Sequence, residues 1–343
     1  MAILRLLIIG LFLLNPAYSL DADDADSEES IEVSAEPVAG FERSNPSRRR
    51  FGDLEFRGGL VLTSTSSSFG GFSALLIQQD GSHFIALSDQ GFWLRGRIIY
   101  EGDRPAAIAD AMMARVLNAE GKPSDRLDTE SMTGDRGTIY VGIERLNQIL
   151  KYEYGKKGFL APGEPILIPP GIKDLPFNQG LEALVFVPEG FALGGTLVAF
   201  SEWGLNEAGD LEGFLVGGPS PGAFSVKRID GYAISDAALL PDGDILILER
   251  KYTPQTGVAM RIRRLPQAAI RPGATVDGPT VIEADSRFMI DNMEALSVHC
   301  TASGATVLTL LSDDNFSRLQ KTILLQFTLL KGGTRRPPPG AKP

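Results

Sequence analysis

The sequence predicts an all-β fold, a β-propeller built from four-stranded blades, and three observations support this prediction. Five segments share one pattern of apolar runs and turns, and they recur about every 55 residues, a period typical of propeller blades. The 343 residues include 38 Gly and 22 Pro, as a fold with many turns needs. Hydrophobic residues make up 43% of the chain, which is enough for a sizeable core.

Each segment begins with a small or acidic residue and a short apolar run. It then turns at a glycine and returns as a second apolar run that ends in an acid. The aligned first positions are Ser73, Glu130, Glu182, Asp236 and Glu294. In the third segment the apolar pattern predicts strands at Ala183–Val187, Thr196–Ser201, Gly213–Val216 and Phe224–Ile229.

The ends of the repeat predict how the ring closes. The last segment has three strands, the third at Thr322–Leu329, whereas Leu54–Leu62 precedes the first segment without a partner. We expect Leu54–Leu62 to supply the missing strand, which removes exposed sheet edges. Five blades are countable, and a sixth is possible only if residues 104–127, with a short helix at Ile108–Leu117, are more than an elaborated connection. A pair of β-sandwiches is the alternative fold, but it would not explain the period.

Residues 1–19 have the pattern of a secretory signal peptide. Arg5 precedes the apolar run Leu6–Leu14, which is too short to span a membrane comfortably, and Ala17-Tyr18-Ser19 supplies small residues before a cut. Residues 20–49 begin with an acidic, aromatic-free stretch and are expected to form a disordered leader. We assign residues 50–330 to the propeller and residues 331–343 to a disordered tail. The protein is therefore expected to be periplasmic or secreted, without stable membrane insertion after cleavage.

Composition excludes several classes of function. The formal net charge is −10, which argues against a nucleic-acid binder that works through a basic surface. Two His and one Cys are too few for a zinc site built from clusters of these residues, and one Cys allows no internal disulfide. We expect a monomer that acts on a small anionic or ester substrate.

Acidic residues recur at two aligned points of the repeat. The first strand of a propeller blade lines the channel and the second runs back antiparallel to it, so the start of the first and the end of the second share one rim. Nine carboxylates are therefore expected at one mouth of the channel: Asp89, Glu130, Glu144, Glu182, Glu202, Asp236, Glu249, Glu294 and Asp313. Ser73 occupies the remaining position, and the flanking residues are Asp128, Asp291, Asn292, Asp314 and Asn315.

So many like charges need compensation, because one pair at about 6 Å costs roughly 3 kcal/mol. Either some carboxylates stay protonated or a cation lies among them, and oxygen ligands without His or Cys favour Ca²⁺. We assign metal binding to Glu130, Glu182, Asp236, Glu294 and Asp313. We assign the orientation or deprotonation of an attacking water to Asp89, Glu144, Glu202 and Glu249. The alternative is structural: acids at strand ends bond to backbone N–H groups and hold neighbouring blades together.

Basic residues follow two of these acids. Arg145 follows Glu144, and Arg250 and Lys251 follow Glu249. They either neutralise the carboxylates or bind an anionic group of the substrate, because a guanidinium matches the oxygens of phosphate or carboxylate. Both interpretations remain open.

Five short motifs resemble one known family. They are Ile85–Gly91, Asp128–Met132, Gln179–Leu184, Ser235–Ala238 and Asp291–Leu296. In their order and spacing the chain resembles the phytase-like domain family, named for the esterase-like activity of phytase and found in secreted bacterial proteins. The resemblance covers about residues 50–330 and implies a propeller whose repeated Glu and Asp residues are catalytic. Ser73 departs from an all-acid ring.

The function expected from the residues and the resemblance is that of a secreted, metal-dependent hydrolase of phosphoric or related esters. No dense lysine cluster suits a polyphosphorylated sugar, so a smaller phosphoric or carboxylic ester is the expected substrate. The alternative is a non-catalytic periplasmic propeller that binds a ligand or a protein partner at its rim, since this fold hosts many functions.

Overall fold

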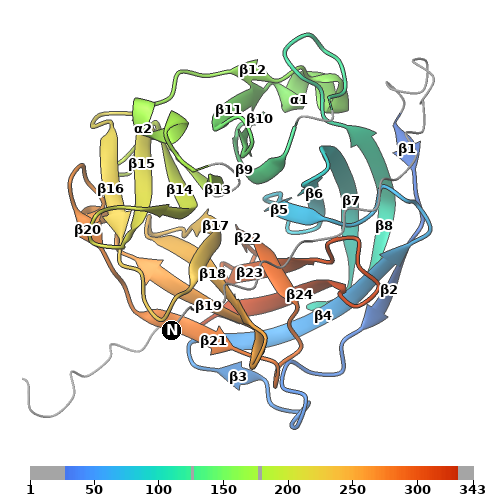
Figure 1. Ribbon diagram of the computed structural model, residues 1–343. Helices are drawn as coiled ribbons and strands as arrows, with labels where there is room; N and C mark the ends of the chain where they lie inside the picture. The colour runs from blue at the N-terminus through green and yellow to red at the C-terminus, as the bar shows by residue number, and fades with distance from the viewer. Residues whose placement is uncertain (1–27, 125–126, 177–179, 331–343) are drawn as a thin grey trace, which may run out of the picture.

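The computed structural model describes residues 28–124, 127–176 and 180–330. These residues form five sheets around a central channel, which confirms the predicted propeller with five blades (Figure 1). From the channel outward, the first four strands of a blade are called A, B, C and D. The predicted signal peptide, residues 20–27 of the predicted leader and the predicted tail lie outside the described residues.

Blades 1 and 2 come first in the chain. Blade 1 consists of β5 (Phe72–Ile77), β6 (His83–Ser88), β7 (Phe92–Glu101) and β8 (Arg104–Arg115), with β1 (Glu29–Ser30) on its outer edge. Blade 2 consists of β9 (Thr129–Asp135), β10 (Thr138–Ile143), β11 (Gln148–Tyr152) and β12 (Glu164–Pro165). The short helices are α1 (Tyr154–Lys157), η1 (Gly158–Leu160) and α2 (Pro170–Lys173).

Blades 3 and 4 follow, and a segment within blade 4 adds one strand to the sheet of blade 3. Blade 3 consists of β13 (Leu181–Val187), β14 (Thr196–Leu205), β15 (Leu211–Gly217) and β16 (Gly222–Val226), close to the four strands predicted. Blade 4 consists of β17 (Ala233–Leu239), β18 (Ile245–Thr253), β19 (Gly257–Leu265) and β21 (Thr280–Ala284). Between β19 and β21, the chain forms η2 (Gln267–Ala269) and β20 (Thr275–Val276), and β20 pairs in parallel with β16.

Blade 5 closes the ring as predicted. Its strands are β22 (Asn292–Cys300), β23 (Thr306–Asp313), β24 (Thr322–Leu329) and, from the N-terminal side, β4 (Leu54–Ser64). Residues 54–62 of β4 pair antiparallel with β24, so strands from the two ends of the described chain share one sheet. β2 (Val33–Pro37) covers the outer edge of β4, and β3 (Arg50–Phe51) pairs with its beginning.

The prediction of a disordered leader is wrong from residue 28 onward. β1 pairs with β8 of blade 1, and β2 pairs with β4 of blade 5. The reason is that apolar residues alternate with polar ones in this segment. Ile31, Val33 and Ala35 pack against the core between blades 1 and 5, and the polar residues between them remain exposed. Further along, Phe41 is fully buried against Phe56 and Phe327.

The prediction of a short helix at Ile108–Leu117 is also wrong. Residues Arg104–Arg115 form β8, the D strand of blade 1, and pair with β7 along nearly their full length. Two register shifts interrupt this pairing, and Asp110 adopts a positive φ of 55° beside one of them. These irregularities break the alternation of side chains that would have marked a strand.

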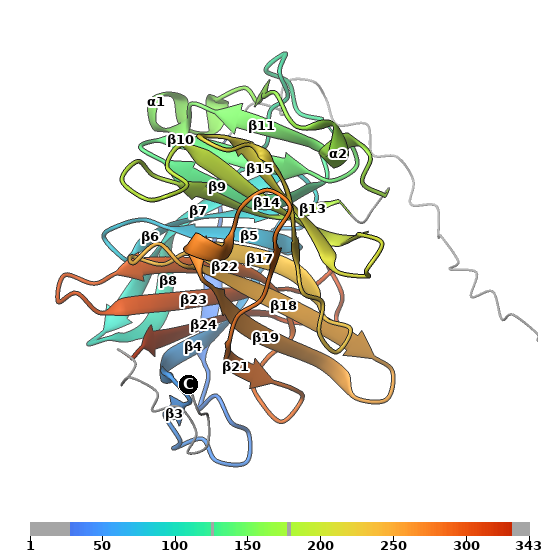
Figure 2. The same cartoon turned by 90° about the vertical axis from the view of Figure 1, so that its left-hand side faces the viewer.

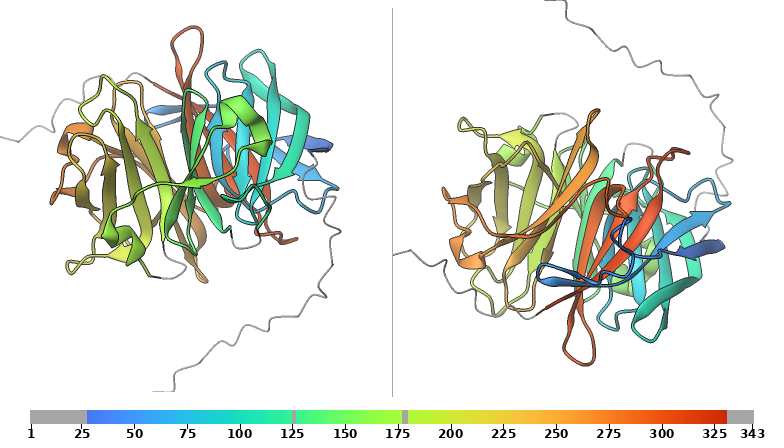
Figure 3. Two further views of the ribbon diagram at one scale, coloured as in Figure 1. Left: turned by 90° about the horizontal axis from the view of Figure 1, so that it is seen from above. Right: turned by 90° about the horizontal axis from the view of Figure 1, so that it is seen from below.

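Adjacent blades pack face to face, as the views from above and below show (Figure 3). Five clusters of buried apolar residues fill the space between and within the sheets. The A strands β5, β9, β13, β17 and β22 contact one another in sequence around the channel. No helix in the described part of the chain combines the length and the apolar character needed to cross a bilayer.

Candidate acidic site at one mouth of the channel

The five A strands share an irregularity at their beginning. In each blade the A–B pairing skips one residue of the A strand, which is the register shift of a β-bulge. The skipped residues are Ser73, Glu130, Glu182, Ser235 and Glu294. A bulge re-aims its side chain, so the repeat places five side chains at one end of the channel.

The ends of the B strands supply the second set of side chains. The residues paired just before each bulge are Ser88, Ile143, Ser201, Glu249 and Ser312. The equivalent positions one residue later are therefore Asp89, Glu144, Glu202, Arg250 and Asp313. The face where A strands begin and B strands end is called the acidic face below. It bears α2, whereas α1 lies on the opposite face (Figure 2).

Blade 4 departs from the predicted alignment by one residue at both points. The bulge falls on Ser235 instead of Asp236, and the rim position of β18 is held by Arg250 instead of Glu249. Because successive side chains of a strand point to opposite faces, this shift turns both predicted acids away from the site. Seven of the nine expected carboxylates occupy the repeated positions.

Asp236 has the structural role that was the alternative at the sequence level. Its Oδ2 accepts a hydrogen bond from the N–H of Leu296 in blade 5 at 2.6 Å, and its Oδ1 accepts one from Ala237 at 2.7 Å. The side chain is buried, and burial raises the pKa of its carboxyl well above the ordinary value. We therefore withdraw Asp236 from the predicted metal ligands, since it joins blades 4 and 5.

Glu249 lies in a separate buried ion network. Its carboxylate accepts hydrogen bonds from Arg261 and Arg263, at distances from 2.7 to 3.3 Å. Both guanidinium groups also donate to backbone carbonyls of the segment that follows β16 of blade 3, those of Ile229 and Lys227. Glu249 is fully buried and paired with two cations, so its predicted role as a base is not supported by its position.

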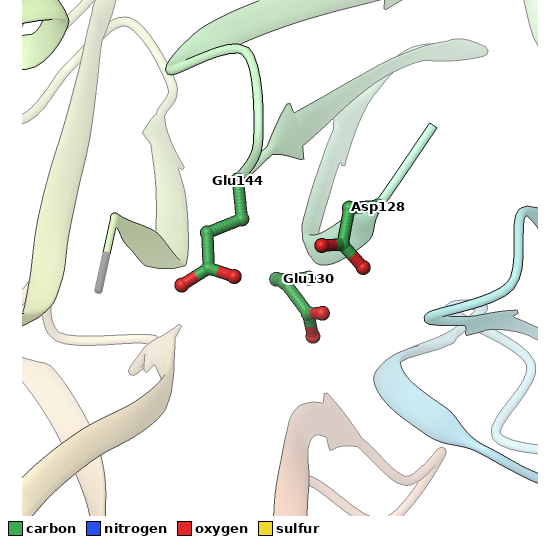
Figure 4. Close-up of side chains that lie close together, drawn as sticks. All are labelled: Asp128, Glu130 and Glu144. Atoms are coloured by element: carbon green, nitrogen blue, oxygen red, sulfur yellow. The ribbon is translucent and has the colours of Figure 1, made fainter. Parts of the chain in front are cut away.

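Carboxylates of blades 2 and 3 converge most closely. Asp128, Glu130 and Glu144 each place an oxygen within 4.8 Å of the others (Figure 4). Glu144, Glu182 and Glu202 form a second group that meets the same limit. Glu144 belongs to both groups, and its Oε1 accepts a hydrogen bond of 3.0 Å from the N–H of Gly180. The five acids thus form two neighbouring triads that share one residue.

Burial and repulsion from neighbouring acids raise the pKa values of the four glutamates in the triads above their usual range. For Glu130 the pKa is raised well above its ordinary value, first by burial and then by the charges of Glu182 and Glu294. For Glu182 burial again comes first, followed by repulsion from Glu202. The carboxyl groups of Glu144 and Glu182 also share a hydrogen bond, which requires a proton between them when no cation is bound.

Asp89 and Asp313 extend the site toward blades 1 and 5. Burial, together with the charges of Asp128 and Glu294, raises the pKa of Asp89 to about 6. Burial and the charge of Glu294 raise the pKa of Asp313 to about 8. Neither residue belongs to a triad, so both carboxyls remain available for proton transfer.

Arg250 is the cation of this site. Its Nη2 donates a hydrogen bond of 2.9 Å to Glu202, and its Nε lies 3.5 Å from an oxygen of Glu294. The charge of Arg250 opposes the rise in the pKa values of Glu182, Glu202 and Glu294. The Nε atom is buried and has no hydrogen-bond partner.

The two other predicted cations lie apart from Arg250. Arg145 is half exposed and pairs with Asp128 at 2.7 Å, so it stands at the edge of the first triad. Lys251 donates to the backbone oxygen of Asp230 at 2.6 Å and lies over the ring of Tyr232. Lys251 therefore stabilises a surface turn of blade 4, and the geometry does not support its predicted role in substrate binding.

The donor set fits a hard cation. Ca²⁺ binds oxygens at about 2.3–2.6 Å, so two ligands of one ion lie no more than about 5 Å apart, a limit that both triads meet. All ligands offered are carboxylate oxygens, which suit Ca²⁺ better than softer metals. The acidic triads could therefore hold a metal ion, with Glu130, Glu144, Glu182 and Glu202 from the repeat and Asp128 beside them.

Two contributors to the site were not assigned a role from the sequence. Asp128 was noted only as a flanking acid, although its position two residues before Glu130 was a signal that it shares the rim. Trp203 follows Glu202, hydrogen-bonds to its carboxylate, and lies 4.2 Å from the guanidinium of Arg228. In the other blades the residue that follows the rim position is Gln90, Arg145, Lys251 or Asp314, so the repeat did not indicate an aromatic ring there.

Comparisons with known proteins give distant structural matches and one family. No curated protein matches the chain. A PQQ-bound aldose sugar dehydrogenase from Streptomyces coelicolor is 12% identical, with a TM-score of 0.41 over 78% of this chain and 98% of its own. An α-L-arabinofuranosidase from Podospora anserina, in complex with cellotriose, is 11% identical and has a TM-score of 0.48. The match covers 76% of this chain and 93% of the arabinofuranosidase.

A family model identifies the chain more specifically than these structures do. The model described as "Esterase-like activity of phytase" matches residues 67–316, which span all five A strands and the whole acidic site. This match confirms the resemblance seen in the sequence motifs. The protein belongs to the phytase-like family, whose model is described by the esterase-like activity of phytase.

Proposed function

We propose that the protein is a calcium-dependent hydrolase of phosphoric or related esters that acts at the acidic face. The observation that carries this proposal is the pair of carboxylate triads joined at Glu144, with all ligand atoms of each triad within 4.8 Å. Five acids this close are stable only when protons or a cation compensate their charge. The family description, esterase-like activity, supports the class of reaction.

The proposed roles follow from position. Glu130, Glu144, Glu182 and Glu202, with Asp128, would hold Ca²⁺. When bound there, the ion would supply Lewis-acid chemistry, which polarises an ester oxygen and lowers the pKa of a nearby water. Arg250 lies between the triads and Glu294, where its guanidinium can orient an anionic ester group. Glu294 and Asp313 remain as acids that position Arg250 and the water.

Asp89 is the proposed general base. Its carboxyl has a pKa of about 6, it belongs to neither triad, and it therefore accepts a proton near neutral pH. In the reaction, the oxygen of water bonds to phosphorus, or to the carbonyl carbon, while the bond to the leaving alcohol breaks. Asp89 takes the proton of the water and then gives it up as the leaving oxygen becomes an alcohol, so its carboxylate is regenerated.

The test uses purified protein with generic phosphomonoester, phosphodiester and carboxyl-ester substrates, with and without Ca²⁺. Glu144→Gln should abolish calcium dependence, because it removes the ligand that both triads share. Asp89→Asn should lower kcat about 100- to 10,000-fold while calcium binding is retained. Asp236→Asn is the matched control, because it removes a buried carboxylate of the same rim that lies outside the triads.

The outcome also decides between catalysis and the alternative of a non-catalytic propeller. Calcium binding without turnover of any ester would favour a binding protein. Turnover equal in wild-type protein and in Glu144→Gln would contradict the assignment of the site.

We further propose that the protein works as a periplasmic or secreted monomer, with no nucleic-acid partner and no stable membrane insertion after cleavage. The pattern of residues 1–19 and the net charge of −10 support this proposal. N-terminal sequencing of the exported protein should show cleavage after Ser19, and light scattering should give the mass of one chain. Retention of the first 19 residues, or a dimer mass, would contradict it.

A further inference from the structure

Large apolar side chains gather on the acidic face. In the described ranges, seven large apolar residues are more than a third exposed, and five of them lie on turns between B and C strands or in the last two residues of a B strand. These five are Leu146, Leu205, Tyr252, Phe316 and Leu319. They come from blades 2, 3, 4 and 5, at the end of the molecule where the carboxylates converge. They are called the apolar rim below.

The other two exposed residues serve as a contrast. Leu167 follows β12, and Leu160 ends η1 on the opposite face. The turns between A and B strands, which belong to the opposite face, carry no such residue in the described chain. Isolated exposed apolar residues are ordinary, but their concentration around one mouth is typical of a binding surface.

Phe316 connects the apolar rim to the acids. A Cβ atom on Gly71 would lie 2.4 Å from the ring of Phe316 and 2.4 Å from Oδ1 of Asp89, so the ring and the carboxylate are neighbours. Phe316 has a φ of 49°, and Asn315 before it has a φ of 48°. Positive φ is costly for a bulky side chain, and such strain is typical of functional segments.

The acids themselves hold this strained turn. Oδ1 of Asp313 accepts a hydrogen bond of 2.6 Å from the N–H of Asn315, and Oδ1 of Asp314 accepts one of 3.0 Å from the N–H of Phe316. On the other side of the mouth, Trp203 hydrogen-bonds to Glu202. Aromatic rings thus contact the acidic site at blades 3 and 5.

We propose that the substrate is an amphiphile: an anionic ester whose hydrocarbon chain or aromatic ring lies across Phe316, Trp203 and the apolar rim while its ester group enters the acidic site. This inference rests on the function proposed above and adds the substrate class. Each methylene fully removed from water tightens binding about fourfold, and a shallow rim that removes about half of the surface gives about twofold.

The test measures binding without catalysis. Ethyl-, butyl- and octylphosphonate are titrated as monomers in the presence of Ca²⁺, and tryptophan fluorescence reports binding. The chain has two tryptophans, and Trp93 is 1% exposed, so a response to ligand comes from Trp203. The dissociation constant should fall at least tenfold from ethyl- to octylphosphonate.

Variants separate the apolar rim from the acids. Phe316→Ala and Leu319→Ser should each flatten the dependence of the dissociation constant on chain length, so that affinity falls more for octylphosphonate than for ethylphosphonate. Leu160→Ser is the control and should change nothing, because Leu160 is an exposed leucine of the opposite face. Leu319→Ser removes a side chain that is 93% exposed, so the variant should fold as stably as the wild-type protein.

The possible failures are distinguishable. Equal affinity for all three phosphonates, or a chain-length dependence that both rim variants leave intact, would overturn this inference without touching the proposed hydrolysis. Tight, chain-dependent binding with no turnover of any ester would support the inference and contradict the hydrolase. In a second arm with phosphatidic acid in phosphatidylcholine vesicles, co-sedimentation that requires Phe316 identifies a lipid as the source, and binding of monomers alone identifies a free amphiphile.

Discussion

Arg250 shows how one residue alters the character of the site. In the other four blades the equivalent rim position holds an acid, and in blade 4 it holds the guanidinium that faces Glu202 and Glu294. A buried charge left without its partner destabilises a protein strongly, and several acids lose theirs if Arg250 is removed.

We predict that Arg250→Gln lowers the free energy of unfolding of the metal-free protein by about 3 kcal/mol near pH 8. The loss should be smaller at pH 6.5, where more of the acids carry protons. Urea unfolding at both pH values measures this loss in the free energy of unfolding. Lys251→Gln is the control, and a comparable loss in that variant would show that Arg250 has no special role.

A second residue-scale prediction contrasts two buried acids of the same rim. Glu182→Gln should stabilise the metal-free protein, because it removes a charge that its neighbours repel, and should reduce stabilisation by Ca²⁺. Asp236→Asn should destabilise it by about 1–3 kcal/mol, because one backbone N–H loses its acceptor. Its calcium response should stay intact. Thermal melts with and without Ca²⁺ measure the stability of both variants. If both were stabilised or both destabilised, Glu182 would not be a metal ligand while Asp236 joins the blades.

At the scale of elements, the strand β4 closes the ring of blades by pairing with β24. It lies between β24 and β2, so both of its edges make ladder hydrogen bonds, whereas β2 is an edge strand that already contains Pro37. Proline in a central strand removes a ladder hydrogen bond, and edge strands tolerate it.

We therefore predict that Val61→Pro in β4 costs about 3 kcal/mol or more and promotes aggregation, because it opens the sheet edge of β24. Ser34→Pro in β2 should cost much less. Chemical unfolding and light scattering of the two variants measure the difference. Equal stability of both would mean that β4 does not close the ring in solution.

At the scale of the whole molecule, the acidic site links stability to pH and to cations. An unfolded aspartate loses its proton near pH 4, whereas in the folded protein the pKa of Asp313 is about 8. Between these values the folded state binds more protons than the unfolded state, so the free energy of unfolding falls as pH rises. His299, whose pKa burial lowers to about 4, acts in the opposite direction, but only below about pH 6.5.

The metal-free protein should therefore lose stability steadily from pH 6.5 to 8.5. Added Ca²⁺ should restore it, by about 2.7 kcal/mol at a hundredfold excess over its dissociation constant, and a chelator should reverse the effect. Melting temperatures across this pH range, with Ca²⁺ or with chelator, provide the measurement. A flat response to chelator, together with stability that rises with pH, would show that the acids are only structural.

The sequence by itself determined the architecture and most of the site. The repeat of about 55 residues, the unpaired Leu54–Leu62 and the aligned acids predicted five blades, the closing strand and seven of the rim carboxylates. These features follow from periodicity, which is visible in a single chain because each blade must bury the same faces.

Only the tertiary structure decided which residue each bulge displaces. In blade 4 a shift of one residue exchanges Ser235 for Asp236 and Arg250 for Glu249. The apolar pattern hardly changes with such a shift, but every side chain turns to the other face. The same holds for residues 28–49: their few apolar side chains cannot form a core alone and find partners only on blades 1 and 5, which the rest of the chain builds.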